Sequence, residues 1–382
     1  MGIDMDCQAV TVAPGKAGSV EIRRVPVERP QRGQVLARTI AVGICGTDAE
    51  IVSGAYGVAP PGSERLVLGH ESLLAVEEVG PDAGDLQAEQ LVVGIVRRPC
   101  PERCLPCSQG RWDLCTSGHY RERGIVGLDG FLREYLVEDA AFLVAVPRAL
   151  EPVAVLLEPL SIVTKAVATG LRVRDAAAAP SGRALVTGAG PIGLLAALLL
   201  RSRDIEVWVV DRQPADSVKA HVVAAMGGHY VDTRHTSLTV AARDVRFDLA
   251  VEATGFTPLI FEAVALLAHD GALVLTGVTS GHRIIDVDAN VLNRGMVLEN
   301  QAVVGSVNAA RIHYEAAVDS LREWSQRWPG LAERLITSRY PLDRFSEALS
   351  KKPDDIKVVV DVGSAPAVTM EPTSNKVGLL TK

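Results

Sequence analysis

The chain has 382 residues, of which 48% are hydrophobic, and its formal net charge at pH 7 is −7. This length predicts two domains, and the acidic balance argues against a general role on nucleic acid or on an anionic membrane. No apolar run reaches about 18 residues without a charge, which argues against a membrane span. The first residues, MGIDMDCQAV, lack the pattern of a secretory signal. We therefore expect a cytoplasmic protein without a nucleic-acid or membrane partner.

Short β-type runs dominate the first 160 residues. Examples are VLARTIAVGI (35–44), LLAVEEVG (73–80) and QLVVGIV (90–96), and Gly and Pro interrupt the segments between them. Short strands separated by turn residues are typical of an antiparallel, barrel-like domain. We expect residues 1–160 to form such a domain.

Three short motifs in this region offer ligands for a metal ion. They are GICGTD with Cys45, LGHE with His70 and Glu71, and LEPL with Glu158. Taken singly, the cysteine is most often a buried apolar residue, the histidine a structural one, and Glu158 an acid at a helix N-terminus. Together they form a mixed sulfur, nitrogen and oxygen set that suits a catalytic zinc with an open coordination position.

Four of the six cysteines lie on one loop with the spacing C-x3-C-x2-C-x7-C: Cys100, Cys104, Cys107 and Cys115. A disulfide knot or a redox centre could also use such a cluster, but cytoplasmic thiols are kept reduced. Four thiolates on a short loop can enclose one tetrahedral Zn²⁺. We expect a structural zinc here, closed by its four ligands.

The segment GRALVTGAGPIGLLAALLL (182–200) reads as a strand, a glycine-rich turn and an apolar helix. The G-x-G-x-x-G turn is weak evidence alone but strong between a strand and a helix, because its glycines let the backbone approach a dinucleotide pyrophosphate. The residues expected to contact the cofactor there are Gly188, Gly190, Pro191, Ile192 and Gly193.

Asp211 ends the next predicted strand, EVWVVDRQ (206–213). An acid about twenty residues after the turn accepts hydrogen bonds from the adenosine ribose, which favours NAD. Arg212 follows directly and could stack on adenine or bind the 2′-phosphate of NADP. The sequence therefore predicts NAD, with use of both dinucleotides open.

Three further strands are predicted at 246–255, 271–278 and 302–307. In parallel sheets, ligands bind beyond the carboxyl ends of the strands. This places a group of residues near the nicotinamide: Thr254, Gly255, Gly277, Val278, Ser306 and Asn308. We expect a dinucleotide-binding domain over residues 161–308, a segment over 309–364 that returns to the first domain, and a poorly ordered tail over 365–382.

These motifs resemble those of the zinc-dependent medium-chain dehydrogenases. The resemblance extends from about residue 20 to 363 and includes GICGTD, LGHE, the four-cysteine loop, DGFLREY (129–135), LEPLSIVTKAV and GAGPIG. LEPLSIVTKA, VEATGF and MVLENQAVVGSVNAARIHYEAAV are most similar to the archaeal glucose dehydrogenases. The family implies an α/β fold, with a GroES-like β-barrel catalytic domain and a Rossmann domain. It also implies a homodimer or homotetramer.

The resemblance also implies roles for single residues. Cys45, His70, Glu71 and Glu158 would hold the catalytic zinc, with the two glutamates exchanging during turnover. Thr47 would relay the substrate proton, and the sugar would contact Glu122, Glu158 and Asn308. The implied reaction is hydride transfer from C1 of an aldose such as glucose to NAD(P)⁺, which yields a lactone.

Two departures from the family pattern bear on this assignment. One residue is added after Cys100, and Val96 stands where the related glucose enzymes have an asparagine. Because an apolar side chain cannot bind a sugar hydroxyl, Val96 supports a second substrate class: a cyclitol, amino sugar, polyol or other secondary alcohol. A nucleotide-binding protein without turnover is a further alternative, although such a protein has no need of an open zinc site.

Overall fold

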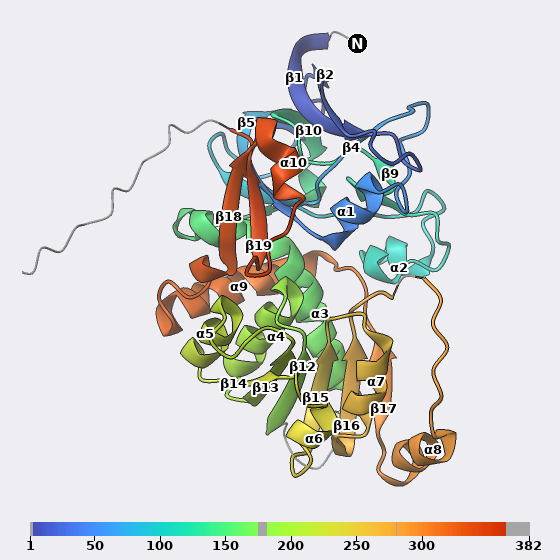
Figure 1. The fold of residues 1–382 in the computed structure, drawn as a ribbon. Coiled ribbons are helices and arrows are strands. Elements are labelled where there is room, and N and C mark those ends of the chain that lie inside the picture. Colours follow the sequence, from blue (N-terminus) through green and yellow to red (C-terminus); the bar gives the residue numbers. More distant parts are fainter. Residues whose placement is uncertain (1–2, 175–181, 280, 364–382) are drawn as a thin grey trace, which may run out of the picture.

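The computed structural model describes residues 3–174, 182–279 and 281–363, and the predicted tail over 365–382 lies outside them. The chain forms two lobes, a β-rich lobe at the top of Figure 1 and a layered α/β lobe below it. This arrangement confirms the predicted fold class. Helix α3 (Leu157–Val173) connects the lobes, and the chain crosses back near α9 (Arg311–Arg327).

The β-rich lobe contains three mostly antiparallel sheets. The largest has the strand order β11-β6-β5-β3-β19-β18, and β10 also pairs with β3. Its strands are β3 (Gln34–Ile44), β5 (Glu71–Val79), β6 (Leu91–Gly94), β10 (Tyr135–Asp139), β11 (Leu143–Ala145), β18 (Ile336–Pro341) and β19 (Lys357–Asp361). The smaller sheets are β2 (Glu21–Glu28), β1 (Ile3–Val12) and β4 (Leu66–Val67), and β7 (Arg97–Arg98), β8 (Arg121–Arg123) and β9 (Gly127–Leu128).

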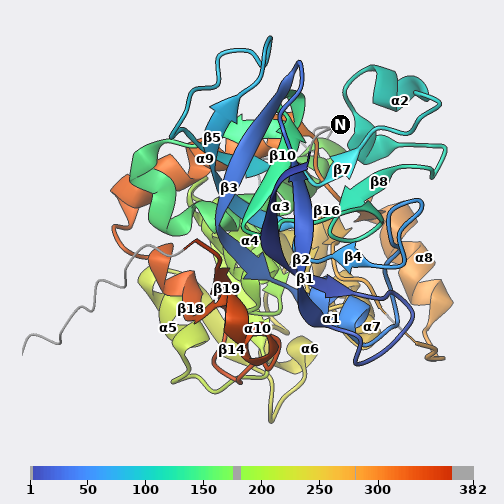
Figure 2. The same cartoon turned by 90° about the horizontal axis from the view of Figure 1, so that it is seen from above.

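The C-terminal strand β19 inserts into this lobe beside the long strand β3. The two strands are antiparallel, and Val358 faces Ile44 while Val360 faces Val42. These side chains are buried in the barrel core with Phe131. Figure 2, seen from above, shows β19 next to β18 at the edge of the barrel. The end of the described chain therefore completes a domain that its beginning started.

The lower lobe contains a six-stranded parallel sheet with the order β14-β13-β12-β15-β16-β17. The strands are β12 (Arg183–Thr187), β13 (Glu206–Asp211), β14 (His229–Asp232), β15 (Phe247–Glu252), β16 (Leu267–Leu275) and β17 (Ala302–Gly305). The strand order reverses direction at β12, and the crevice at such a point is where dinucleotides bind.

Helices cover both faces of the parallel sheet, as burial of an all-parallel sheet requires. Ala184 and Val186 of β12 pack in one core cluster with α3 and α4, whereas Leu185 packs in another with α6 and α7. These helices include α4 (Pro191–Arg201), α5 (Val218–Ala225), α6 (Leu238–Ala241) and α7 (Thr257–Val264), whereas α8 (Ala289–Leu298) buries none of its residues. Short helices elsewhere are α1 (Gly46–Val52), α2 (Leu105–Ser108), α10 (Phe345–Ala348), η1 (Trp112–Leu114), η2 (Ala140–Phe142), η3 (Arg148–Leu156), η4 (Glu333–Leu335) and η5 (Leu342–Arg344).

One helical stretch, Arg148–Val173, is long and apolar enough to cross a membrane by length and composition. It consists of η3 followed by α3, and 83% of its most apolar window is buried inside the protein. That burial is the behaviour of a core helix. The stretch brings Glu158, in the first turn of α3, to the junction of the two lobes.

Candidate active site

Cys45 lies at the end of β3, where the chain turns sharply into α1. It is the N-cap of that helix: its Sγ accepts a hydrogen bond from Thr47 N at 3.3 Å, and its own N–H donates to Asp48 Oδ2 at 2.9 Å. This reciprocal capping satisfies backbone donors that a helix start leaves open. The turn fixes the Cys45 thiol and places Thr47 two residues further on, in the first turn of α1.

Glu71 begins β5, and His70 directly precedes the strand, beside Cys45. His70 Nε2 lies 3.0 Å from Cys45 Sγ. The donor atoms of His70, Glu71 and Glu158 lie within 4.8 Å of one another, and so do those of Cys45, Asp48 and His70. His70 therefore belongs to both groups, and the other three predicted ligands of the catalytic metal lie around it.

Two charged residues that the sequence analysis did not select complete this site. Asp48 is fully buried, and its Oδ1 lies 3.5 Å from His70 Nδ1. Lys357, at the start of β19, donates from Nζ to both carboxylate oxygens of Glu71 at 2.6 and 2.5 Å. A lysine inside the apolar strand IKVVVDV was the available signal for the second, because a buried ammonium needs a partner.

The electrostatics of the site favour positive charge at its centre. Burial alone would lower the pKa of His70, but the charges of Cys45 and Asp48 outweigh it and raise that pKa well above its usual value. Burial raises the pKa of Glu158 to about 7, with the nearby charge of Glu71 acting in the same direction.

The donor set suits zinc. A half-buried thiol, a buried imidazole and a buried carboxylate, in a site that attracts positive charge, are ligands that catalytic zinc uses. Asp48 stands behind His70, as the carboxylates that orient metal-binding histidines do. The residues present therefore fit a zinc ion.

The four clustered cysteines also come together. Their sulfur atoms lie within 4.8 Å of one another, and Cys104 Sγ is 3.8 Å from Cys115 Sγ. The residue added after Cys100 is accommodated in a tight turn, in which Arg103 adopts φ 48° and its N–H donates to the Cys100 carbonyl. Backbone N–H groups lower the pKa of the Cys104 thiol to about 5, which favours the thiolate that zinc binds.

The glycine-rich turn has the geometry that a dinucleotide needs. Gly188 has φ +93°, and a Cβ on Gly193 would lie 1.8 Å from the Gly188 carbonyl oxygen. Asp211 ends β13 and accepts hydrogen bonds from Ala189 N at 2.6 Å and Gln213 N at 2.9 Å. Gly190 is the N-cap of α4, and Pro191 and Ile192 form its first turn. Arg212 follows Asp211 with its side chain exposed.

The loops after β15 and β16 meet at the carboxyl edge of the sheet. A Cβ on Gly277 would lie 2.2 Å from Gly255 N, and a Cβ on Gly255 would lie 2.7 Å from the Val278 carbonyl. Fully buried Glu252 holds this edge, since its carboxylate accepts from the N–H groups of Thr254 and Gly255. The sequence analysis missed Glu252, although an acid ending an apolar strand was a signal for it.

The predicted nicotinamide and sugar residues meet between the lobes. Ser306 Oγ is buried without a hydrogen-bond partner within the described residues. Asn308, at φ 59°, donates from Nδ2 to Glu122 Oε1 at 2.7 Å. Arg97 Nε donates to the same oxygen at 3.0 Å. Glu122 is thus buried and bridged to the dinucleotide lobe, and its charge is felt at Glu158.

Val96 does not behave as an exposed pocket residue in this structure. Its side chain is 2% exposed and packs in the barrel core, and its backbone N–H lies 3.4 Å from Tyr314 Oη.

A GroES-like barrel and a doubly wound dinucleotide-binding sheet, with a mixed zinc ligand set between them, define the zinc-type medium-chain dehydrogenases. Residues 31–148 match the model of the alcohol dehydrogenase GroES-like domain, and residues 151–362 match that of the glucose dehydrogenase C-terminus. Among curated relatives, glucose 1-dehydrogenase of Methanocella arvoryzae is 40% identical and covers 94% of this chain and 100% of its own. Glucose 1-dehydrogenase of Thermoproteus tenax is 43% identical, and the match covers 93% of this chain and 99% of that relative.

Solved structures agree with these relatives. Glucose dehydrogenase of Haloferax mediterranei, in complex with NADP, Zn and gluconolactone, superposes with a TM-score of 0.85 at 32% identity, covering 94% of this chain and 99% of that one. The chain therefore belongs to the zinc-type medium-chain dehydrogenase family, in its glucose dehydrogenase branch.

Proposed function

We propose that this enzyme oxidises an aldose such as glucose at C1 to its lactone, with NAD(P)⁺ as hydride acceptor. The observation that carries the proposal is the contact of Glu122 with Asn308 beside the zinc ligand set. A carboxylate and an amide offer the acceptors and donors that fix neighbouring sugar hydroxyls. Relatives at 40 and 43% identity that are named glucose 1-dehydrogenases support the same substrate.

In this mechanism Cys45, His70 and Glu158 would hold the catalytic zinc. When bound, zinc supplies Lewis acidity that stabilises negative charge on an alcohol oxygen. Thr47 Oγ accepts the proton of the C1 hydroxyl and passes it towards solvent. Glu122 and Asn308 orient the sugar so that its C1 hydrogen faces the nicotinamide, and burial of the site excludes water. A bound nicotinamide would supply the hydride acceptor.

We assign different tasks to the two glutamates of the zinc site. Both oxygens of Glu71 are occupied by Lys357 in this structure, whereas the elevated pKa of Glu158 reflects a buried carboxylate that is poorly compensated. Glu158 therefore supplies the resting carboxylate ligand. If Glu71 entered the zinc shell, its carboxylate would share or give up the contact with Lys357.

We propose NAD⁺ as the preferred acceptor and one structural zinc in addition to the catalytic ion. Asp211 ends β13, where an acid accepts from the adenosine ribose hydroxyls. Its oxygens already anchor the glycine-rich turn through Ala189. Exposed Arg212 would bind the 2′-phosphate when NADP⁺ is used. The four cysteines, Cys100, Cys104, Cys107 and Cys115, would hold the structural ion.

We further propose a homodimer or homotetramer in the cytoplasm. Helix α8, which stands apart from the main body in Figure 1, and the residue two positions before it expose large apolar side chains. These are Val287, Val291, Val297 and Leu298. A second copy that covers them would remove an apolar surface from water. Light scattering on the zinc-replete enzyme measures the subunit count.

The proposed reaction is tested by nicotinamide absorbance with a panel of substrates. Glucose, galactose, xylose, inositol and simple secondary alcohols are each offered with NAD⁺ and with NADP⁺. Turnover on aldoses, with a lactone as product, supports the proposal. Turnover on inositol or secondary alcohols alone overturns it in favour of the second substrate class, to which the apolar residue Val96 pointed.

A further inference from the structure

The small sheet β7–β8–β9 has two faces with different charge. On one face Arg97 pairs with Glu122, next to the predicted sugar site. On the other face Arg98 lies directly opposite Arg121 in the ladder, and Arg123 follows on the same side of β8. Like charges directly opposite each other on neighbouring strands are destabilising. The second face therefore concentrates positive charge.

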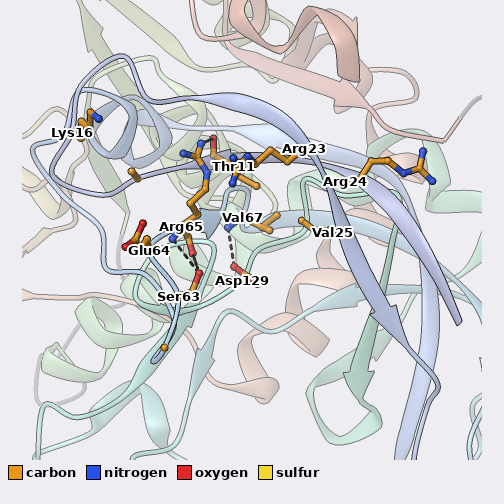
Figure 3. Close-up of a pocket in the computed structure, with 12 residues that line it drawn as sticks. Thr11, Lys16, Arg23, Arg24, Val25, Ser63, Glu64, Arg65, Val67 and Asp129 are labelled. Atoms are coloured by element: carbon orange, nitrogen blue, oxygen red, sulfur yellow. Dashed lines mark hydrogen bonds between the residues drawn. The ribbon is translucent and has the colours of Figure 1, made fainter. Parts of the chain in front are cut away.

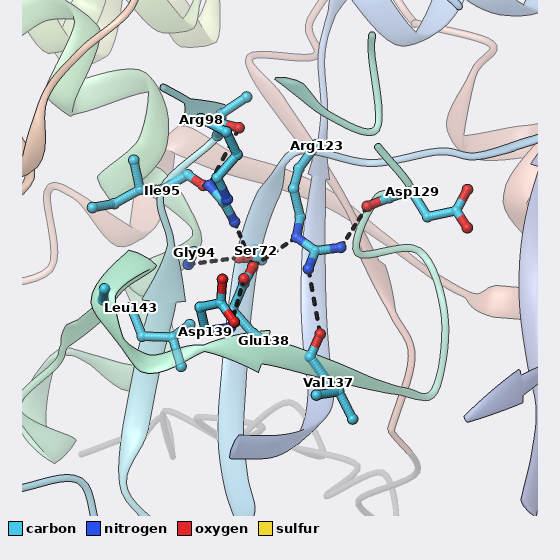
Figure 4. A network of polar contacts seen from close by, with 12 residues as sticks. Ser72, Gly94, Ile95, Arg98, Arg123, Asp129, Val137, Glu138, Asp139 and Leu143 are labelled. Carbon is cyan, nitrogen blue, oxygen red and sulfur yellow. Dashed lines mark hydrogen bonds and ion pairs between the residues drawn. The ribbon is translucent and has the colours of Figure 1, made fainter. Parts of the chain in front are cut away.

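Two of these arginines are buried and share a single carboxylate. Arg98 Nη2 and Arg123 Nε lie 2.5 and 2.6 Å from the same oxygen, Oε2 of Glu138 (Figure 4). The other Glu138 oxygen accepts from Asp139 N. Two guanidinium groups against one carboxylate leave an excess of one positive charge. The other hydrogen bonds of both guanidinium groups go to backbone carbonyls, which carry no net charge.

The excess charge is costly in this environment. Arg98 is 5% exposed and Arg123 is 7% exposed. Burial lowers the pKa of Arg98 to about 10, and the charge of Arg123 acts in the same direction although Glu138 opposes it. A buried cation of this kind gains stability from a second anion.

A cavity of about 310 Å³ lies against these two arginines. Its rim carries Arg103 and Arg121, which are exposed and whose side chains make no hydrogen bond or ion pair with another described residue. The only acids in its lining are Glu138 and Asp139, and Asp139 also accepts from Gln34. Four arginines therefore face two carboxylates around one solvent-accessible space.

We propose that this cavity binds a phosphate-type oxyanion. Guanidinium forks match the oxygens of phosphate, and the buried pair supplies charge while the rim pair supplies free N–H donors. The site lies on the face of β7 and β8 opposite Arg97 and Glu122, so it is separate from the sugar residues. The inference does not depend on the proposed substrate.

A second basic pocket, of about 570 Å³, offers a natural comparison (Figure 3). Its central cation, Arg65, pairs with Glu21 and donates to Thr11 Oγ1 at 2.9 Å. Lys16 and Arg24 lie at opposite ends of this groove and are exposed. No buried pair of cations shares one acid in the lining of this pocket. The pocket is therefore basic but lacks the buried excess of positive charge that the first cavity has.

The test uses the zinc-replete enzyme with saturating NAD⁺, which fills the pyrophosphate site. Inorganic phosphate is titrated calorimetrically at constant ionic strength into the wild type, the rim double variant Arg103→Ala/Arg121→Ala and the control double variant Lys16→Ala/Arg24→Ala. The two double variants remove the same charge from exposed positions. We expect one phosphate per chain, bound at least about tenfold more weakly by the rim variant and unchanged in the control.

Three results would overturn the proposal. The wild type could bind no phosphate, which would mean that Glu138 alone balances the two buried arginines or that a protein group fills the cavity. All three proteins could bind equally, which would locate phosphate elsewhere. Both double variants could lose affinity equally, which would reduce the effect to general surface charge.

Discussion

Lys357 Nζ lies 2.6 and 2.5 Å from the two carboxylate oxygens of Glu71, and both side chains are almost fully buried. The two residues are 286 positions apart in the chain. Their contact ties the C-terminal strand β19 to the metal site, because Glu71 begins β5 and both strands flank β3. The segment that closes the barrel thus also neutralises the Glu71 carboxylate of the metal site.

Replacement of Lys357 by methionine leaves the Glu71 carboxylate buried and unpaired. We expect Lys357→Met to lower the free energy of unfolding by about 3–5 kcal/mol, the usual cost of breaking one half of a buried ion pair. The double variant Lys357→Met/Glu71→Gln should recover part of this loss, since no charge is then left unpaired. Denaturant unfolding of the zinc-replete enzyme measures both. Equal stability of Lys357→Met and the wild type would show that Lys357 does not neutralise the Glu71 carboxylate.

Gly43 keeps space for the same carboxylate. A Cβ at this position would lie 2.1 Å from Glu71 Oε2, whereas a Cβ on Gly46 would meet nothing within 4 Å. Gly43→Ala should therefore cost about 1–3 kcal/mol through overpacking and weaken zinc retention, while Gly46→Ala changes little. Thermal unfolding and zinc analysis compare the two variants. If both behave alike, the close approach at Gly43 has no energetic consequence.

His313 makes stability depend on pH. Burial lowers its pKa to about 4, and its Nδ1 accepts the Ala310 N–H at 3.0 Å at the start of α9. In the unfolded chain His313 takes up a proton near pH 6.5, whereas in the folded protein it stays neutral down to about pH 4. The contribution of His313 to the free energy of unfolding is therefore complete above pH 6.5 and is lost as the pH falls towards 4. Its size is roughly 3 kcal/mol.

The variant His313→Gln tests this dependence. Glutamine at the third helical position can still accept from the N-cap N–H but cannot titrate. We expect the melting temperature of the variant to fall less steeply than that of the wild type between pH 6.5 and 4. Parallel curves for the two proteins would show that His313 does not titrate in this range.

Arg212 should govern the use of NADP⁺. Its exposed side chain follows the acid that ends β13. Arg212→Ala should raise KM for NADP⁺ about tenfold, since one charged hydrogen bond to a phosphate is lost, and leave KM for NAD⁺ unchanged. The exposed residue Arg243, which pairs with Asp244, provides the matched control. An equal rise for both dinucleotides would indicate that Arg212 contacts adenine rather than the 2′-phosphate.

Much of this architecture follows from local sequence. The glycine-rich turn between an apolar strand and an apolar helix is read from neighbouring residues, because backbone geometry and burial leave local patterns. The clustered cysteines are equally local. The four predicted catalytic ligands come from three separate motifs, and the structure places the other three around His70.

Other contacts depend on tertiary packing and left weaker signals. Lys357 could be seen as an anomaly in an apolar strand, but its partner could not, since strand pairing sets which residue it meets. The same holds for Arg98 and Arg123, whose common carboxylate comes from a third strand, β10. Local patterns show which groups need partners, whereas the fold determines who those partners are.

The central claim is that a zinc ion held through Cys45 is required for sugar oxidation. We would measure zinc content, NAD⁺ binding and glucose turnover for the wild type, Cys45→Ala and the control Cys7→Ala, whose native thiol is buried elsewhere and donates to the Tyr135 carbonyl. We predict two zinc ions and lactone formation for the wild type and the control. Cys45→Ala should hold one zinc ion, bind NAD⁺ normally and lose turnover. Wild-type turnover of glucose by Cys45→Ala would contradict the account.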